Sequence, residues 1–345
     1  MGEASRRWMR AAGVGVHGHI ARRRWLARSY LSAAGRLSKR LPDALAKRRL
    51  VNLLRASPWP SVPFPPQVVR VAAGLPLRIV PHAGEFDFDA LFFNTLDYEA
   101  EVFTALRPRL ADYDAIVEIG ANVGLYTLFF AALLRAEGGS RPVFAFEPSP
   151  EAFARLLENV RVNDARNVHA FNCAVSTVAG PVEFFEPRGH LTNGSLRRAV
   201  AALFADEVDR RIVPAVDGRF IEQLLRPFER VLIKIDVEGA EVTVLRSLES
   251  VIVSKRPDIA LEVLPLDVDD LRQVDFIHRL YRRFSITDRG LVPTPQFEAN
   301  DRFRDCLLVP VSAPRRGEAG LEAGNLARTV SHAGASTTPW GAPSR

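Results

Sequence analysis

The sequence is poor in cysteine and contains no long, uninterrupted apolar run. Its two cysteines, Cys173 and Cys306, cannot form a zinc-binding set or a disulfide framework, so we expect a reducing compartment and a cytoplasmic location. The longest apolar run, residues 116–134, contains Glu118 and Asn122, which a lipid-facing helix would not tolerate. The apolar run near the start of the chain is too short for a secretory signal. A membrane-spanning helix is therefore not expected.

Acidic residues are scarce at one end of the chain. Residues 1–55 contain 14 Lys and Arg against 2 Asp and Glu, whereas the whole sequence of 345 residues contains 46 and 40. The net charge of +6 therefore comes from an N-terminal arm, and the rest of the chain is mildly acidic. This distribution does not indicate that the whole protein binds nucleic acid.

Changes in composition divide the chain into four segments. We expect a basic, partly helical extension over residues 1–56. A proline-rich, extended linker follows over 57–67, because proline removes a backbone donor and disfavours helix before it. Residues 68–311 are predicted to form the folded domain. The tail over 312–345 is small, polar and aperiodic, and we expect it to be disordered.

Short apolar runs alternate with helical patterns across the folded domain. Most runs are followed by a helical pattern, which indicates right-handed crossovers and a doubly wound, mostly parallel sheet of the α/β class. The runs are apolar nearly throughout, as expected when helices cover both faces of a sheet. The predicted strands are 115–119, 142–147, 168–175, 230–237, 258–264, 284–288 and 305–311, and the predicted helices are 122–136, 149–164, 218–226, 239–250 and 269–283.

A glycine-rich turn follows the first predicted strand, where ligands bind in such sheets. Gly120 permits a tight turn, Gly124 lets the helix start lie close to the strand, and Asn122 is small enough for a ligand to approach the backbone. The spacing matches neither the dinucleotide fingerprint nor a Walker A loop. With the acidic Glu118 just before it, the turn suits a ligand bearing an ammonium or sulfonium cation. A tight turn without a ligand is the alternative.

Acidic residues end three further strands. Glu147 comes 23 residues after Gly124, about where an acid that accepts both ribose hydroxyls belongs, although an acid at a helix N-terminus is the alternative. Asp236 and Glu238 follow the fourth strand and would share one face if the strand continues. Carboxylates in one crevice perturb each other's pKa, which is typical of functional sites, although Glu238 also suits a solvated helix N-terminus.

Glu262 ends the fifth strand and is expected to point into the same crevice. Together with Asp236 it could hold a hard divalent cation, which prefers oxygen ligands. No further ligand is identifiable from the sequence, so we expect no metal.

The order of these motifs resembles the FkbM-type methyltransferases, which are class I enzymes that use S-adenosylmethionine. The resemblance covers residues 97–265, and the string K-I-D-V-E-G-A-E (residues 234–241) is its most specific part. It is carried by the segments VEIGANVGLYTLFFA, FAFEPSPEAFARLLENV, NCAVS, VPAVDGRFIEQLL, IKIDVEGAEVTVLRSL and RPDIALEVL. The resemblance implies a Rossmann-like, seven-stranded sheet with a reversed final hairpin.

The same resemblance implies the roles of the site residues. It implies that Glu147 binds the ribose, that the region from Asn172 to Ala174 lies near the adenine, and that Asp236 faces the crevice of methyl transfer. The residues implied to surround the methionine part of the cofactor are Glu118, Gly120, Asn122 and Gly124.

These observations predict an S-adenosylmethionine-dependent methyltransferase that acts on a hydroxyl of a small metabolite, sugar or lipid-linked molecule. Oxygen is favoured partly by exclusion, because the chain lacks a Pro-Pro-aromatic motif after the fourth strand and a Pro-Cys nucleophile. The candidates for the base that removes the hydroxyl proton are Asp236, Glu238 and Glu262. The alternatives are a nicotinamide-dependent oxidoreductase and a non-catalytic module that binds nucleic acid or an anionic membrane through the basic arm. No nucleic-acid or membrane partner is firmly indicated, and the oligomeric state is not predicted.

Overall fold

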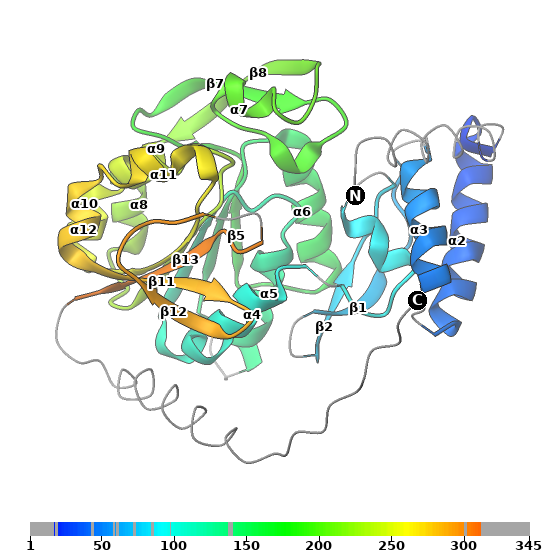
Figure 1. Cartoon of the computed structure of the whole chain (residues 1–345), viewed down its shortest axis with the longest axis horizontal. Coiled ribbons are helices and arrows are strands. Elements are labelled where there is room, and N and C mark those ends of the chain that lie inside the picture. Colours follow the sequence, from blue (N-terminus) through cyan, green and yellow to red (C-terminus); the bar gives the residue numbers. More distant parts are fainter. Residues whose placement is uncertain are drawn as a thin grey trace, which may run out of the picture. The chain divides into compact units, whose positions relative to one another are not determined.

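The structure is a computed structural model of the chain (Figure 1). It describes residues 17, 20–42, 45–57, 59, 62–71, 74–83, 86–96, 98–136, 141–299 and 302–311. The tail predicted to be disordered, residues 312–345, lies outside the described residues. No helix in the described part of the chain is both long enough and apolar enough to cross a membrane.

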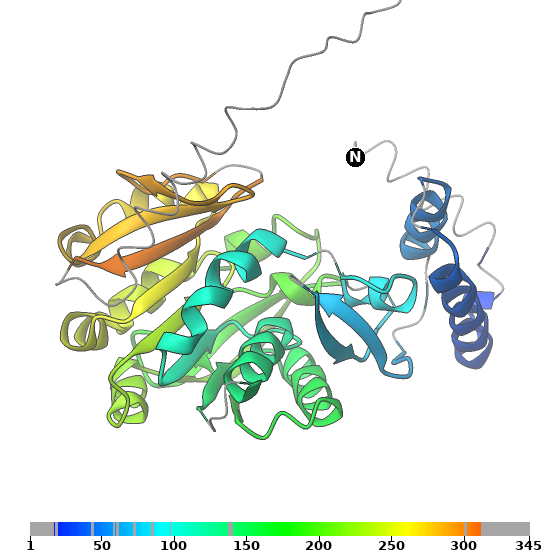
Figure 2. The same cartoon turned by 90° about the horizontal axis from the view of Figure 1, so that it is seen from below.

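Eight strands form the central sheet, in the spatial order β12 (Gly290–Thr294), β11 (Tyr281–Thr287), β13 (Asp305–Pro310), β10 (Asp258–Glu262), β9 (Val231–Ile235), β3 (Ala115–Ile119), β4 (Val143–Phe146) and β5 (Val168–Phe171). The five strands from β10 to β5 are parallel, whereas β13 pairs antiparallel with β10 and β11. Figure 2 shows β11, β12 and β13 (orange) together at one edge of the sheet. The chain passes from β3 to β4 and β5 on one side and then crosses to β9 on the other, so the doubly wound α/β fold is confirmed.

Helices cover both faces of this sheet, which explains why its strands are apolar throughout. Ile116 and Val117 of β3 belong to two different buried clusters, because successive side chains point to opposite faces. The cluster with Val117 includes α8 (Gly218–Leu225), α9 (Glu241–Ser247), α10 (Glu249–Lys255) and α12 (Asp275–Leu280). The cluster with Ile116 includes α4 (Ala100–Leu106), the 3-10 helix η3 (Arg107–Asp112) and α5 (Leu125–Ala136).

One helix that matters for the site, α6 (Pro150–Val162), begins directly after β4. Its first turn is capped by Ser149, whose hydroxyl oxygen accepts a hydrogen bond from the Ala152 N–H at 3.4 Å. Proline at the first helical position suits the start of a helix, because its missing N–H would be unpaired there anyway. The start of α6 therefore fixes the chain just beyond Glu147.

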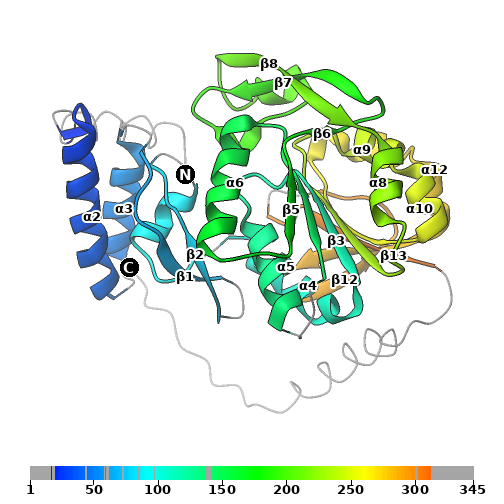
Figure 3. The ribbon, with the colours of Figure 1, turned by 180° about the vertical axis from the view of Figure 1, so that it is seen from behind.

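A second, three-stranded sheet has the order β6 (Ala174–Val175), β8 (Val208–Val216) and β7 (Gly180–Pro187). Its strands β7 and β8 lie beyond one end of the central strands in Figures 1 and 3. The connection between β7 and β8 contains the 3-10 helix η4 (Leu191–Asn193) and α7 (Arg198–Ala201). The predicted strand over 168–175 is therefore two strands, β5 and β6, which belong to different sheets.

Three other element predictions differ from the structure. The helix predicted over 239–250 is interrupted at Leu248, so that it forms α9 and α10. The helix predicted over 269–283 is broken into α11 (Val268–Leu271), which follows the 3-10 helix η5 (Pro265–Asp267), and α12. It ends at Leu280, because Tyr281, Phe284 and Ile286 bury their side chains from strand β11. The sheet has eight strands instead of seven, because β12 pairs with β11. Strand β12 begins with Gly290 and contains Pro293. Both residue types are depleted in strands, so the sequence pattern did not indicate a strand there.

The N-terminal part contains α2 (Arg24–Arg40), α3 (Leu45–Ala56), the hairpin β1 (Gln67–Val71) and β2 (Leu75–Ile79), and the 3-10 helix η2 (Phe86–Leu91). Trp59 and Phe64 of the predicted linker are buried in one apolar cluster with Leu31 of α2 and Leu54 of α3. This segment therefore packs on the helices, because its aromatic side chains bury a large apolar area there. The predicted domain boundaries stay a prediction.

Candidate active site

A cavity of about 270 Å³ lies at the carboxyl ends of β3, β4, β9 and β10. In doubly wound sheets, ligands bind at this edge beside the reversal in strand order. All the predicted site residues line the cavity except Gly124 and Asn172. Those that line it are Glu118, Gly120, Asn122, Glu147, Ala174, Asp236, Glu238 and Glu262.

The glycine turn after β3 is packed tightly against its neighbours. Gly120 has a φ of +90°, and a Cβ added there would lie 1.7 Å from the backbone oxygen of Asp236. Gly124 has a φ of +88°, and a Cβ there would lie 2.3 Å from Leu156 Cδ1 on α6. Both positions therefore require glycine, for the backbone conformation and for the close approach.

Glu147 ties the loop after β4 to the glycine turn. Its carboxylate accepts hydrogen bonds from the N–H groups of Asn122 and Ser149, each at 2.7 Å. Burial raises the pKa of Glu147 to about 7, although these two hydrogen bonds favour the charged form. Each carboxylate oxygen can accept a second hydrogen bond, so the group retains capacity for two hydroxyl donors.

Asn172 supports this loop from outside the cavity. Its side-chain amide donates to the carbonyl oxygen of Glu147 at 2.8 Å and to that of Pro148 at 3.2 Å. Ala174, two residues later, lines the cavity itself. The segment predicted to lie near adenine thus contains one supporting residue and one lining residue.

Glu118 is a buried carboxyl group at the end of β3. It accepts a hydrogen bond from the Thr127 hydroxyl at 2.5 Å. Burial raises the pKa of Glu118 to about 8, because the charged form loses its hydration. A cationic ligand beside it would favour the charged form again.

A buried ion pair lies at the end of β9. Lys234 Nζ donates to Asp236 Oδ2 at 2.6 Å and lies 4.1 Å from the centre of the Tyr126 ring. Burial by itself would lower the pKa of Lys234, but Asp236, Glu99 and Asp305 together raise it. Lys234 is therefore a fixed positive charge beside Asp236.

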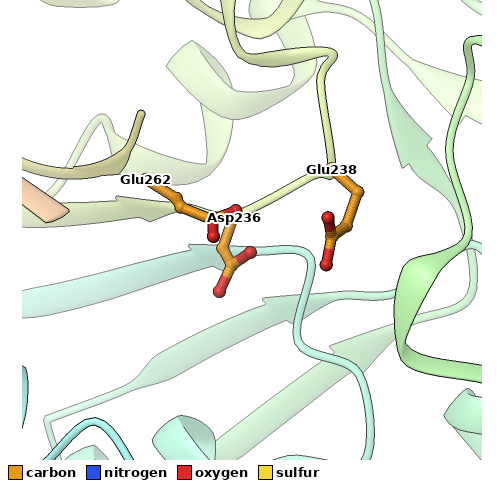
Figure 4. A group of neighbouring side chains, drawn as sticks. All are labelled: Asp236, Glu238 and Glu262. Atoms are coloured by element: carbon orange, nitrogen blue, oxygen red, sulfur yellow. The ribbon is translucent and has the colours of Figure 1, made fainter. Parts of the chain in front are cut away.

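Three carboxylates gather beyond β9 and β10, as Figure 4 shows for Asp236, Glu238 and Glu262. One oxygen of each lies within 4.8 Å of the others. Burial, followed by the charge of Asp236, raises the pKa of Glu238 to about 8 and that of Glu262 well above its ordinary value. Glu238 can therefore exchange a proton near neutral pH, as acid–base chemistry requires, whereas burial and the neighbouring charges favour the protonated form of Glu262.

The connection between β7 and β8 forms one wall of the cavity and holds the loop after β9. Residues 191–194 line the cavity, and Asn193 Nδ2 donates to Glu238 Oε1 at 3.1 Å. The Ser195 hydroxyl donates to the carbonyl oxygen of Glu238 at 2.7 Å, and Arg197 donates to that of Gly239 at 2.9 Å. This connection therefore positions Glu238.

Comparison with known proteins identifies the family. The sequence matches the family model described as "Methyltransferase FkbM domain" over residues 118–284. The 31-O-demethyl-FK506 methyltransferase FkbM of Streptomyces tacrolimicus is 32% identical over 187 residues, which cover 47% of this chain and 68% of that protein. The chain belongs to the FkbM methyltransferase family.

Two further relatives have lower sequence identity. Methyltransferase sdnD of Sordaria araneosa is 29% identical over 160 residues, covering 39% of this chain and 60% of that protein. The hexuronic acid methyltransferase AglP of Haloferax volcanii is 26% identical over 156 residues, covering 45% and 59%. The chain thus spans about 60% of the length of these two relatives. Membership of the FkbM family implies S-adenosylmethionine as the cofactor, and it does not favour a nicotinamide-dependent oxidoreductase.

Several cavity residues of this FkbM-family protein were not among the predicted site residues. Tyr98 and Glu99 precede the first strand of the central sheet, yet both line the cavity, and the Tyr126 hydroxyl donates to Glu99 Oε2 at 2.6 Å. The family resemblance starts at residue 97, which was the available signal for Tyr98 and Glu99. Asn193 and Arg304 also line the cavity and had no signal of their own in the sequence.

The buried carboxyls predict a pH dependence of stability for this FkbM-family fold. Glu118 and Glu147 have a pKa of 4.5 when unperturbed, and burial raises these values to about 8 and 7. Between these limits the folded state binds more protons than the unfolded state, so the stability that these two groups contribute is fully present below about pH 4.5 and is lost as the pH rises toward 7 and 8. Each group contributes a slope of about 1.4 kcal/mol per pH unit.

The measurement is urea unfolding of the ligand-free protein between pH 5 and pH 8. Glu118→Gln should flatten the slope, because glutamine still accepts from Thr127 but does not titrate. The exposed Glu249→Gln is the matched control and should leave the slope unchanged. A stability that rises across this range, or a slope that Glu118→Gln does not alter, would contradict the assignment.

Proposed function

We propose that the protein transfers a methyl group from S-adenosylmethionine to a hydroxyl oxygen of a small-molecule acceptor. The observation that carries the proposal is a single cavity lined by the glycine turn, Glu147 and Asp236. Two relatives are named for 31-O-demethyl-FK506 and for hexuronic acid. We therefore favour a hydroxyl-rich acceptor, such as a sugar, over a nucleic acid.

The residues of the cavity suit this cofactor. Asn122 Oδ1 is buried and has no hydrogen-bond partner among the described residues, so it is free to accept from an ammonium group. The remaining acceptor capacity of Glu147 suits two ribose hydroxyls, and Ala174 leaves room for a flat ring. Glu118 and Asp236 supply negative charge, which suits a sulfonium. When bound, S-adenosylmethionine would supply the electrophilic methyl group.

The chain itself would contribute positioning and proton removal. Holding the two reactants in line is worth about 7–11 kcal/mol at best, provided that the cavity keeps water out. A hydroxyl nucleophile must also lose its proton, and a carboxylate within reach of it can accept that proton. Asp236, Glu238 and Glu262 are the candidates, because their carboxylates gather at one place in the cavity.

Calorimetric titration with S-adenosylhomocysteine and with NAD separates the two enzyme hypotheses. We expect the wild-type protein to bind S-adenosylhomocysteine and not NAD. Binding of NAD alone would overturn the proposal in favour of an oxidoreductase. Binding of neither would favour a non-catalytic module.

Glu147→Ala is expected to weaken binding of S-adenosylhomocysteine by at least about tenfold. The variant loses charge-assisted hydrogen bonds to the ribose, worth about 1.5–3 kcal/mol, and the acceptors that hold the Asn122 and Ser149 N–H groups. The matched control is Glu151→Ala, four residues further on in α6, where the carboxylate pairs with Arg155 at 2.8 Å and does not line the cavity. Equal affinities for the two variants would remove the ribose assignment.

The acceptor is best sought with isotopically labelled S-adenosylmethionine. We expect mass spectrometry to find the labelled methyl on an oxygen of a hydroxylated small molecule or sugar. Label found on nitrogen or on carbon would contradict the O-methyltransferase assignment while leaving the cofactor assignment intact.

A further inference from the structure

The ends of two neighbouring strands, β9 and β10, bring together the carboxylates of Asp236, Glu238 and Glu262. Each has a side-chain oxygen that accepts no hydrogen bond within the described part of the chain. Lys234 donates a hydrogen bond to Asp236 Oδ2, and Asn193 donates one to Glu238 Oε1. The second oxygen of each of these two carboxylates can therefore still bind a ligand. One oxygen of each of the three carboxylates lies within 4.8 Å of the others, so together they can offer several oxygen ligands at one place in the cavity.

Glu262 gives a second and separate indication of a missing ligand. Its Oε2 atom is sealed from solvent and has no hydrogen-bond partner among the described residues. Figure 4 shows its side chain extending toward Asp236. A buried carboxylate oxygen without a donor is costly, because it loses water and gains nothing in return. Such an atom implies a partner that a described side chain does not supply.

We propose that Asp236, Glu238 and Glu262 bind a divalent metal cation. Hard divalent cations prefer carboxylate oxygens and are commonly completed by water and by substrate oxygens. Oxygens on opposite sides of Ca²⁺ lie roughly 4.6–5.2 Å apart, and those around Mg²⁺ about 4.0–4.2 Å apart. The three ligand oxygens lie within 4.8 Å of one another, which is no wider than the span across Ca²⁺ and somewhat wider than the span across Mg²⁺.

The cation explains how the acceptor hydroxyl is deprotonated, and this step rests on the proposed methyltransferase function. A cation beside the hydroxyl oxygen favours the deprotonated form and orients a neighbouring hydroxyl or carbonyl oxygen of the same acceptor. The new O–CH₃ bond then forms as the CH₃–S bond breaks, which yields the methyl ether and S-adenosylhomocysteine, and the hydroxyl proton passes to an oxygen of one of the three carboxylates and from there to solvent. An acceptor with two adjacent oxygens, such as a vicinal diol of a sugar, is the class that this arrangement selects.

The test is a titration of the chelator-treated, full-length protein with Mn²⁺, in which the signal of free Mn²⁺ is followed by electron paramagnetic resonance. We expect one saturable site per chain. Glu262→Gln should weaken binding at least about tenfold, because it removes one charged ligand and keeps the shape. Glu238→Gln is the second variant and should weaken it similarly, which keeps the test valid should one variant fold poorly.

Glu99→Gln is the matched control, because it removes a negative charge from the same cavity but outside the three ligands. Its affinity for Mn²⁺ should fall by clearly less than that of Glu262→Gln, because Glu99 contributes negative charge but no ligand oxygen to the site. Absence of a saturable site, or an equal effect of Glu262→Gln and Glu99→Gln, would overturn the proposal. Parallel calorimetry with S-adenosylhomocysteine separates the two claims: if that ligand binds and Mn²⁺ does not, only the metal site is wrong, and the reverse result retains the metal site and removes the proposed function.

Discussion

Replacing Gly120 with alanine is expected to abolish measurable binding of S-adenosylhomocysteine and to lower the free energy of unfolding by at least about 3 kcal/mol. The added Cβ would lie 1.7 Å from the backbone oxygen of Asp236, so the glycine turn and the loop after β9 must separate. That separation moves Asp236 relative to the turn and opens the cavity between them. The measurements are urea unfolding and calorimetry on the same sample.

The control for this variant is Gly290→Ala in the β11–β12 hairpin. Gly290 has a φ of +97°, close to that of Gly120, but a Cβ there would meet nothing within 4 Å. It should therefore cost only the backbone strain of about 1–2 kcal/mol and leave binding of S-adenosylhomocysteine unchanged. Equal behaviour of the two variants would mean that the close approach of the two loops does not shape the site.

Replacing Lys234 with methionine is expected to lower the free energy of unfolding by about 3–5 kcal/mol at pH 7, although the side chains are similar in size. Lys234 is buried, and its Nζ compensates the charge of Asp236 at 2.6 Å while Glu99 and Asp305 lie in its field. Without it, several partly buried carboxylates face one another without a cation. Chemical unfolding monitored by circular dichroism measures the loss.

Two comparisons make this second test specific. Lys39→Met removes a lysine whose Nζ donates to Gln67 Oε1 at 2.8 Å, and it should cost less than about 1 kcal/mol. The double variant Lys234→Met with Asp236→Asn should be less destabilised than the sum of the two single variants, because it leaves no unpaired charge in the pair. Strict additivity would show that Lys234 and Asp236 do not act as a pair.

The strands of the central sheet were predictable because the burial of each strand is visible in its own residues. Strands buried on both faces are continuous apolar runs, and β3, β9 and β10 stand out for that reason. β12 escaped prediction because it is half exposed and contains Gly290 and Pro293, so its pairing with β11 decides its structure. The end of the helix predicted over 269–283 was misplaced for a similar reason. The sequence has a helical pattern up to residue 283, but from Tyr281 onward the chain pairs with β13 as a strand.

The cavity residues also divide into those that the local sequence predicted and those that depend on contacts between distant segments. Gly120, Glu147 and Asp236 were predictable because each follows a parallel strand, and the carboxyl ends of such strands meet at one edge. Asn193, by contrast, reaches Glu238 from 45 residues away along the chain, and only the folded β7–β8 connection brings the two together. Asn172 does not line the cavity, and its amide instead holds the Glu147 loop through the carbonyl oxygens of Glu147 and Pro148. Contacts made across such distances leave no pattern in a single sequence.

The most direct measurement of the central claim is a crystal structure of the protein grown with S-adenosylhomocysteine. The account predicts that both ribose hydroxyls lie within hydrogen-bond distance of the Glu147 carboxylate, with the adenine beside Ala174. It also predicts that the sulfur faces the space between Gly120 and Asp236. Electron density for the nucleoside at another place, or a ribose turned away from Glu147, would contradict it.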